Sequence, residues 1–342
     1  MLTGILLGVA ATSSARDAGN INVREHTAST AAGGPAYCIA GHDIGKLFLS
    51  VNNNGTFGDG FSFSGTRDCF TDERVFSCEY PKGSRTTYLF AGAFWIGAIV
   101  GRDTLVSTGA DGWLTTNEFH PDPPPLGDMI FRSIVDPAKP EFKGAVSEQD
   151  YIAVYTDTCS TCQGVVPDPR DGRAHIPLNI EVTQRSYAWS YSYADDFVLF
   201  DYSIKNIGQR RLRKVYMGVY VDADVHDRGD QFSGFDDDLC GFFSTQPAIE
   251  GFTTGFNCPH IDTVNIAYII DNDGDFDAKP PFDTPVPNVT ATKIVRTPSD
   301  SLKVSFNWWI SNGDPKLDYG PQTHEHFRDL GTGGQGTPHG DR

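Results

Sequence analysis

The feature that most constrains this chain is a seven-residue acidic run at positions 271–277, Asp-Asn-Asp-Gly-Asp-Phe-Asp. Its carboxylates stand at every second position, at Asp271, Asp273, Asp275 and Asp277. Carboxylates this close repel one another, and they cannot be packed away from water unless a cation lies among them. The run therefore predicts a loop that either holds a cation or stays solvated.

Calcium is the cation that suits this run best. Ca²⁺ prefers about six to eight oxygen ligands, and a flexible loop with Gly274 at its bend delivers them over a short stretch of chain. The run is not an EF-hand, because its glycine stands fourth rather than sixth and its twelfth position is Phe282 instead of Glu. The alternative interpretation is a solvated acidic turn without an ion.

A second acidic cluster lies earlier in the chain, at the end of an alternating apolar segment. It consists of Asp222, Asp224 and Asp227, followed by the triple aspartate Asp236, Asp237 and Asp238. Asp222 and Asp224 point the same way along an extended chain, so both would reach one cation. The triple aspartate would complete that site or solvate a loop tip. If the two acidic clusters converge at one end of the fold, two or more ions would lie side by side.

The overall charge limits the partners of this protein. Its 44 acidic residues outnumber its 27 basic residues, and the formal net charge is −17. Such a chain is repelled by nucleic acid phosphates and by anionic membranes, so neither is an expected partner. No stretch approaches about 18 uninterrupted apolar residues, so no transmembrane segment is predicted.

The N-terminal residues indicate export. Residues 1–15 hold an apolar stretch followed by Ser-Ser-Ala, which resembles the later part of a secretory signal peptide with its small-residue cleavage site. The basic start of such a signal is missing, so the alternative is a buried first strand or a strand that assembles with a neighbouring molecule. Residues 16–35 are polar, rich in Ala, Thr and Gly, and are expected to form a tether.

Composition and periodicity favour strands. Aromatic residues are frequent and Gly and Pro are plentiful, which suits many short strands joined by turns. A short helix is expected within 144–151, where Ser147 opens a helix-start pattern. Strands are expected at 47–51, 85–100, 104–108, 180–189, 196–206, 214–222, 263–270 and 301–310.

These strands predict an all-β fold, an antiparallel β-sandwich of Ig-like or jelly-roll-like type. One or two packed sandwiches would carry long calcium-stabilised loops. Loop zones between 120 and 175 suggest a β-rich N-terminal part at 36–140 and a β-sandwich with acidic metal-binding loops at 141–342. One continuous domain over 36–342 is the alternative.

Cysteine spacing predicts disulfides that pin loops, and with them an oxidising compartment. Close spacing suggests three pairs, and it leaves Cys38 without a partner. The pairs are Cys69 with Cys78, Cys159 with Cys162, and Cys240 with Cys258. A redox or zinc motif is the rival interpretation of the second pair, but no second CxxC occurs for zinc and no βαβ pattern surrounds it.

No catalytic motif stands out, so we predict that the protein is not an enzyme. Paired carboxylates also serve glycoside hydrolases, so a secreted hydrolase stays open as an alternative. The fragment His324-Glu325-His326 is interpreted as an exposed polar turn, because no third ligand follows at helical spacing.

The tryptophans bear on a further alternative, a carbohydrate- or protein-binding module. Exposed aromatic rings would support such a module, whereas buried rings would belong to the core. We interpret four tryptophans as core residues, namely Trp95, Trp189, Trp308 and Trp309.

Several strings resemble a class of uncharacterised large secreted β-rich proteins of Gram-negative bacteria, which are often predicted to carry type IX secretion sorting domains. The strings lie at 88–98, 184–191, 220–225 and 317–321, and the resemblance covers most of 45–342. It implies a secreted, extracellular or cell-surface role, with Asp222, Asp224 and the 271–277 run matching the acidic segments of that class.

The sequence as a whole predicts a secreted, calcium-binding, non-enzymatic structural protein of a surface, filament or matrix. Calcium would lock its loops and bridge subunits. Self-association or binding to other cell-surface proteins is expected, through exposed strand edges or the N-terminal segment, and a glycan is a further expected partner.

Overall fold

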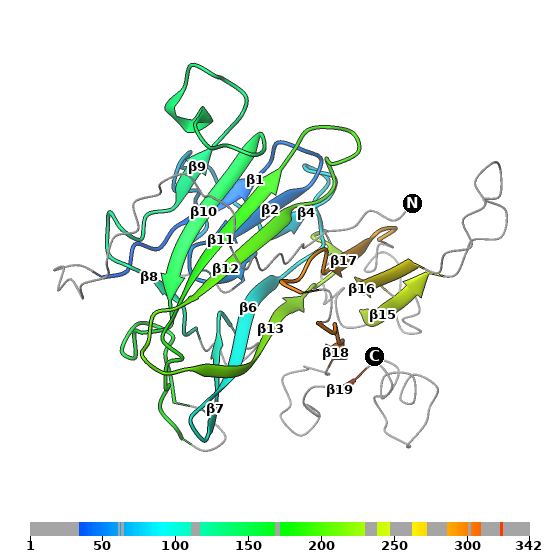
Figure 1. Cartoon of the computed structure of the whole chain (residues 1–342). Coiled ribbons are helices and arrows are strands. Elements are labelled where there is room, and N and C mark those ends of the chain that lie inside the picture. The colour runs from blue at the N-terminus through cyan, green and yellow to red at the C-terminus, as the bar shows by residue number, and fades with distance from the viewer. Residues whose placement is uncertain are drawn as a thin grey trace.

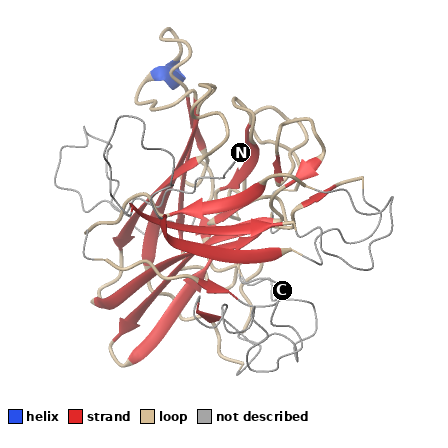
Figure 2. Ribbon diagram, turned by 90° about the vertical axis from the view of Figure 1, so that its right-hand side faces the viewer, coloured by secondary structure: helices blue, strands red, loops and turns tan. Residues whose placement is uncertain are grey.

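The structure is a computed structural model of the whole chain. It describes residues 34–60, 62, 65–110, 117–167, 172–229, 238–246, 262–271, 286–299, 302–308 and 322–323. Within these ranges the fold is all-β, with several antiparallel sheets and no α-helix (Figures 1 and 2). The helical segment in Figure 2 is a single 3-10 turn, η2 (Pro140–Phe142).

The largest sheet has nine strands among the described residues. Its hydrogen-bonded order is β13-β6-β3-β2-β4-β5-β14, with β1 on β2 and β7 on β6. The bounds of its strands are β1 (Ile39–His42), β2 (Phe48–Asn52), β3 (Thr56–Phe57), β4 (Cys78–Glu79), β5 (Thr86–Thr87), β6 (Ala91–Val100), β7 (Asp103–Thr108), β13 (Leu212–Asp222) and β14 (His226–Asp227).

Three smaller sheets complete the described part. The five-stranded sheet runs β12-β11-β10-β8 with β9 on β10, the three-stranded sheet runs β15-β16-β17, and β18 pairs with β19. Their bounds are β8 (His120–Pro121), β9 (Ile130–Arg132), β10 (Gln149–Thr156), β11 (Ile180–Ala188), β12 (Leu199–Asn206), β15 (Leu239–Gln246), β16 (Asp262–Ile270), β17 (Val289–Lys293), β18 (Asn307–Trp308) and β19 (Gln322–Thr323).

The core lies between the nine-stranded and five-stranded sheets. Phe94 of β6 stacks on Tyr202 of β12 with ring centroids 4.6 Å apart, and both are fully buried. The rings of Phe57 in β3 and Phe200 in β12 also meet across the two sheets, with centroids 5.4 Å apart and planes tilted by 44°. Aromatic rings from facing sheets therefore fill one core, and Figure 1 shows β10, β11 and β12 lying over the strands of the larger sheet.

Gly92 makes room for this packing. A Cβ atom at this position would lie 1.9 Å from the Phe57 ring, which no side chain tolerates. Because glycine has no side chain, the Phe57 ring rests directly on the backbone of β6. This contact explains why β6 contains small residues among its bulky apolar ones.

Most expected strands are confirmed, with two differences in extent. The long segment 85–100 divides into β5 and β6, and the expected strand 301–310 is represented among the described residues by β18 alone. Among the strands of five or more residues, three were not expected from the sequence, namely β10, β15 and β17.

The predicted helix within 144–151 is wrong. The carboxylate of Asp150 accepts hydrogen bonds from the backbone N–H groups of Val146 and Ser147, at 2.7 Å each. These polar residues form a tight turn rather than a helix start, and the chain enters β10. That strand then pairs with β11 over its whole length, from Gln149 to Thr156.

The disulfides differ in part from expectation. Cys159 pairs with Cys162, as predicted. The predicted pairing of Cys69 with Cys78 is wrong, because Cys69 is bonded to Cys38, 31 residues away in sequence, with Cα atoms 5.7 Å apart. Cys78 is a free, fully buried thiol, and burial raises its pKa. The prediction from close spacing in the sequence fails here, because the pairing of β1 with β2 determines which loops lie next to each other. Cys258 lies outside the described residues, so its pairing with Cys240 stays a prediction.

The pairing of β13 with β6 joins the two expected parts of the chain. β6 belongs to 36–140 and β13 to 141–342, and their register runs from Leu212 opposite Val100 to Asp222 opposite Ala91. Within the described ranges, no helix has the length and apolar character needed to cross a membrane.

Replacing Phe94 tests the shared core. We expect Phe94→Ala to lower the free energy of unfolding by about 3–5 kcal/mol, because it leaves a cavity between the two sheets. Phe142→Ala, at a partly exposed position of η2, is the matched control and should cost less than about 1 kcal/mol. Equal losses of unfolding free energy for the two variants, measured by urea unfolding, would contradict a core between the sheets.

Candidate functional site

The acidic site begins where β13 ends. The backbone carbonyl of Asp222 accepts a hydrogen bond from Phe90 N–H at 2.9 Å, which fixes the end of the strand. Its side chain accepts the Tyr220 hydroxyl at 2.9 Å. Burial raises the pKa of Asp222, and the Tyr220 hydrogen bond offsets only part of that rise. A nearby cation would stabilise the charged form of this carboxylate.

Asp238 brings the triple-aspartate segment to the same place. Its carboxylate accepts the backbone N–H of Val225 at 2.8 Å. Val225 lies in the turn that carries Asp222 and Asp224, and its side chain is fully buried in the core. Asp238, the last residue of the triple aspartate, therefore lies beside the turn that carries Asp222 and Asp224.

The 271–277 run begins beside Asp238. Leu239 and Ile270 are paired at the end of the antiparallel β15–β16 ladder. Asp238 precedes Leu239 and Asp271 follows Ile270, so the two aspartates lie across from each other at the same end of the sheet. Asp271 is buried, and its carboxylate accepts Val286 N–H at 2.8 Å. Asp238 and Asp271, the described members of the later two acidic segments, therefore lie at one end of the three-stranded sheet, and Asp238 also contacts the turn that carries Asp222.

We call this region the acidic end. Its described residues are Asp222, Asp224, Asp227, Asp238 and Asp271. Asp227 lies in β14, paired with β5, and its carboxylate accepts Gly229 N–H at 2.6 Å. Among the described residues, no three His, Cys, Asp or Glu side chains come close enough to hold a metal ion.

The remaining predicted ligands lie outside the described residues. They are Asp236, Asp237, Asp273, Asp275 and Asp277. Calcium binding at the acidic end therefore stays a prediction. The described carboxylates supply its framework, since Asp238 and Asp271 tie the acidic segments to the core by backbone hydrogen bonds.

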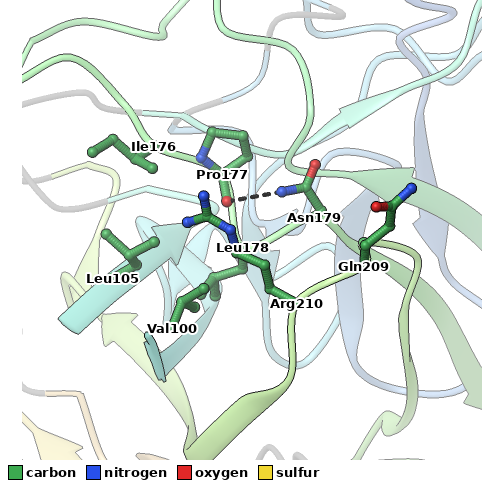
Figure 3. Close-up of a pocket in the computed structure, with 9 residues that line it drawn as sticks. Val100, Leu105, Ile176, Pro177, Leu178, Asn179, Gln209 and Arg210 are labelled. Carbon is green, nitrogen blue, oxygen red and sulfur yellow. Dashed lines mark hydrogen bonds between the residues drawn. The ribbon is translucent and has the colours of Figure 1, made fainter. Parts of the chain in front are cut away.

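A cavity of about 450 Å³ lies at the other end of β6 and β13. Figure 3 shows the apolar side chains of Val100, Leu105 and Ile176 on one side, Asn179 and Gln209 on the other, and Arg210 between them. Its volume falls within the usual range for small-ligand pockets. An apolar lining with one guanidinium suits a group that carries both an apolar part and a negative charge.

A buried ion pair holds one wall of this cavity, and the sequence analysis missed it. His175 lies in the loop before β11, and its Nδ1 is 2.8 Å from a carboxylate oxygen of Glu118. Its Nε2 is 2.9 Å from the backbone carbonyl of Asp157. With Glu118 ionised, both ring nitrogens face acceptors, so both must donate and the ring is an imidazolium.

The electrostatics agree with a charged ring. Burial lowers the pKa of His175, but the hydrogen bond and charge of Glu118, with a smaller contribution from Asp157, outweigh burial and raise the pKa above 6.5. Nearby, burial, with a smaller contribution from the charge of His175, lowers the pKa of His120 to about 4. No local sequence pattern marks this pair, because its partners stand 57 residues apart.

The Asp157 carboxylate anchors the same loop. It accepts the Ser107 hydroxyl at 2.7 Å and the backbone N–H groups of Leu178 and Ile180 at 2.6 and 2.9 Å. β7, β10 and the start of β11 are thereby joined by one buried carboxylate. This group has a structural role, since both of its oxygens accept hydrogen bonds from the protein.

The tryptophans divide between core and surface. Trp308 is buried, as expected, whereas Trp95 and Trp189 are partly exposed. Trp95 stacks on Tyr220 with ring planes 8° apart, on the outer face of the β6–β13 pair. Trp309 and the His324-Glu325-His326 fragment lie outside the described residues.

Comparison of the chain with protein-family models, with curated proteins and with solved structures finds no match.

The buried ion pair predicts a pH-dependent difference in stability. We expect His175→Gln to lower the free energy of unfolding by about 1–3 kcal/mol below pH 6.5, because Glu118 loses its charged partner. Since the folded pKa of His175 is raised, its contribution is complete below the unfolded pKa and is lost as pH rises through the folded value. The difference in melting temperature between the wild type and His175→Gln should therefore become smaller in alkaline buffer.

His120→Gln is the contrasting variant. The depressed pKa of His120 means that the wild type loses stability as pH falls from about 6.5 towards 4, and this variant should lack that loss. If the difference in melting temperature between the wild type and His175→Gln stays constant across the pH series, the assignment of His175 as an imidazolium is contradicted.

Proposed function

We propose that this protein is a secreted, non-enzymatic, calcium-binding structural protein of an extracellular surface, filament or matrix. The observation that carries the proposal is the position of two acidic segments, whose described residues lie at one end of the three-stranded sheet, one of them against the turn that carries the third. It rests on two contacts, Asp238 with Val225 N–H and Asp271 with Val286 N–H, and on the register of Leu239 with Ile270.

The repulsion expected between carboxylates at every second position of 271–277 supports the proposal of a bound cation. Two like charges 4 Å apart repel by about 1 kcal/mol in water and about 4 kcal/mol near a protein surface. Asp222, whose pKa burial already raises, would be the most costly to ionise. A divalent ion coordinated by several of these oxygens would convert that repulsion into attraction and would fix the loops that carry them.

The architecture that we propose for this role is a β-sandwich of Ig-like or jelly-roll-like type with calcium-stabilised loops. Aromatic rings that pack against one another between the two larger sheets support it. The Cys38–Cys69 and Cys159–Cys162 disulfides weakly favour an oxidising, exported environment, since cytosolic thiols are kept reduced.

A carbohydrate-binding module is the second candidate. The observation that favours it is an aromatic patch in the connection between β11 and β12. Tyr191 and Tyr193 are exposed and stack with ring centroids 5.6 Å apart, and the partly exposed Trp189 lies nearby in the chain. Exposed aromatic rings with polar tips suit contact surfaces.

Thermal melts with and without calcium test the leading proposal. We expect millimolar Ca²⁺ to raise the melting temperature over that in EDTA, by the equivalent of about 2.7 kcal/mol where free calcium is a hundredfold above Kd. The double variant Asp222→Asn/Asp224→Asn should lose most of this increment, because it removes two carboxylates of the acidic end.

The matched control is Asp72→Asn/Asp136→Asn, which makes the same charge change at two exposed positions away from the acidic end. It should keep the full calcium response. A wild type that melts at one temperature in calcium and in EDTA would exclude calcium as a structural ion here.

A further inference from the structure

The cavity beside Arg210 is assembled from four stretches of chain that lie apart in the sequence. Val100 ends β6 and Leu105 lies in β7, while residues 176–179 precede β11 and residues 208–210 lie in the turn between β12 and β13. Figure 3 shows the Arg210 side chain extending from this turn towards the apolar side chains. A space built from so many elements keeps its shape only if those elements are fixed to one another.

Hydrogen bonds fix the turn that carries Arg210. The backbone carbonyl of Asn179 accepts the N–H groups of Ile207 and Gly208, at 2.9 and 3.1 Å. The side chain of Asn206 accepts Gly208 N–H at 2.9 Å and donates to the Arg210 carbonyl at 2.8 Å. A Cβ atom at Gly208 would lie 2.8 Å from Cβ of Asn179, so the turn rests directly on the cavity wall. The cavity is therefore formed in advance, which lowers the entropic cost of binding a ligand.

The lining of the cavity is aliphatic and partly shielded from water. Val100, Leu105 and Leu178 are 4%, 8% and 3% exposed, whereas Ile176 is 51% exposed. No aromatic side chain is among the described residues that line the cavity. Such a surface suits an aliphatic chain better than a ring, which gains most from an aromatic partner.

Arg210 supplies the charge of the cavity. It is the single charged residue among the described residues that line the space. Its guanidinium makes no hydrogen bond or ion pair with the part of the chain that the structure describes. The neighbouring Arg211 is also exposed, and Arg213 donates to the Gly101 carbonyl at 2.6 Å, beside the end of β6. A ligand can therefore pair with Arg210 without displacing a protein carboxylate.

The charge around the cavity differs from that of the whole chain. Residues 202–221 carry five cations and no carboxylate, in a chain whose formal net charge is −17. Two carboxylates lie on neighbouring strands, Asp103 at the start of β7 and Glu181 in β11, and the latter is 3.6 Å from Lys205. Cations outnumber carboxylates in this region, so it attracts an anion that the rest of the molecule repels.

We propose that this cavity binds a small aliphatic carboxylate, such as a medium-chain fatty acid anion. The tail lies on the apolar lining, and the carboxylate pairs with Arg210, whose planar guanidinium matches the two carboxylate oxygens. This site goes beyond the proposed structural function and does not depend on calcium. It lies at the Val100 end of the β6–β13 pair, whereas Asp222 ends β13 opposite Ala91.

Calorimetric titration of the full chain with three octyl compounds tests the charge that the site prefers. Octanoate, 1-octanol and octylamine share one tail and carry a negative, a neutral and a positive head group at neutral pH. We expect octanoate to bind saturably, with one equivalent per chain. Octanol should bind more weakly, and octylamine at least about tenfold more weakly than octanoate, because hydrogen bonds between charged groups are the stronger ones.

Arg210→Gln tests the residue that we assign to the carboxylate. It should lower the affinity for octanoate at least about tenfold and leave the affinity for octanol unchanged. Lys139→Gln removes one positive charge at an exposed position near η2, so this matched control should bind octanoate like the wild type. Ile176→Ser should weaken octanoate and octanol alike, because it removes apolar surface from the lining.

Three results would overturn the proposal. The first is a wild type that binds no octanoate at millimolar concentration, and the second is octanoate binding no tighter than that of octanol or octylamine. The third is an Arg210→Gln protein that binds octanoate as the wild type does. The head-group series on the wild type needs no substitution, so it decides the proposal even where a variant folds poorly.

Discussion

The hydrogen bonds that fix two carboxylates at the end of β13 are the interactions on which our account of this protein depends, namely Tyr220 hydroxyl to Asp222 and Val225 N–H to Asp238. Backbone hydrogen bonds to Asp238 and Asp271 hold two further acidic segments against the turn that carries Asp222. A fold driven by apolar burial alone would keep such segments apart. Their proximity is the observation on which our calcium proposal rests, and it is why we place the proposed function of this chain at its acidic end rather than in its core.

Strand pairing produces this arrangement. The pairing of β6 with β13 carries the chain from the β6–β7 turn to Asp222, and the pairing of β15 with β16 sets Asp238 across from Asp271. The aromatic core between the two larger sheets holds both pairs in place, with Phe94 on Tyr202 as its closest stack. At the opposite end, the His175–Glu118 ion pair fixes the loop that lines the cavity.

Local pattern predicted the all-β class and most long strands, because alternation along 180–189 or 214–222 reflects burial on one face. The local pattern failed to predict features that tertiary contacts determine. The turn around Asp150 uses helix-start residues to enter a strand, and Cys69 bonds to distant Cys38 instead of nearby Cys78. The acidic clusters were recognised from spacing alone, but their meeting depends on strand register, and the His175 ion pair depends on residues with no shared motif.

The most direct test of the calcium account is the amount of calcium that the purified chain binds. Equilibrium dialysis against buffered Ca²⁺, with the metal counted in both compartments, gives this number without reference to stability or assembly. The account predicts saturable binding of at least one equivalent per chain, reduced when Asp222 and Asp224 are replaced by asparagine. A chain that binds no calcium at millimolar free Ca²⁺ would contradict it.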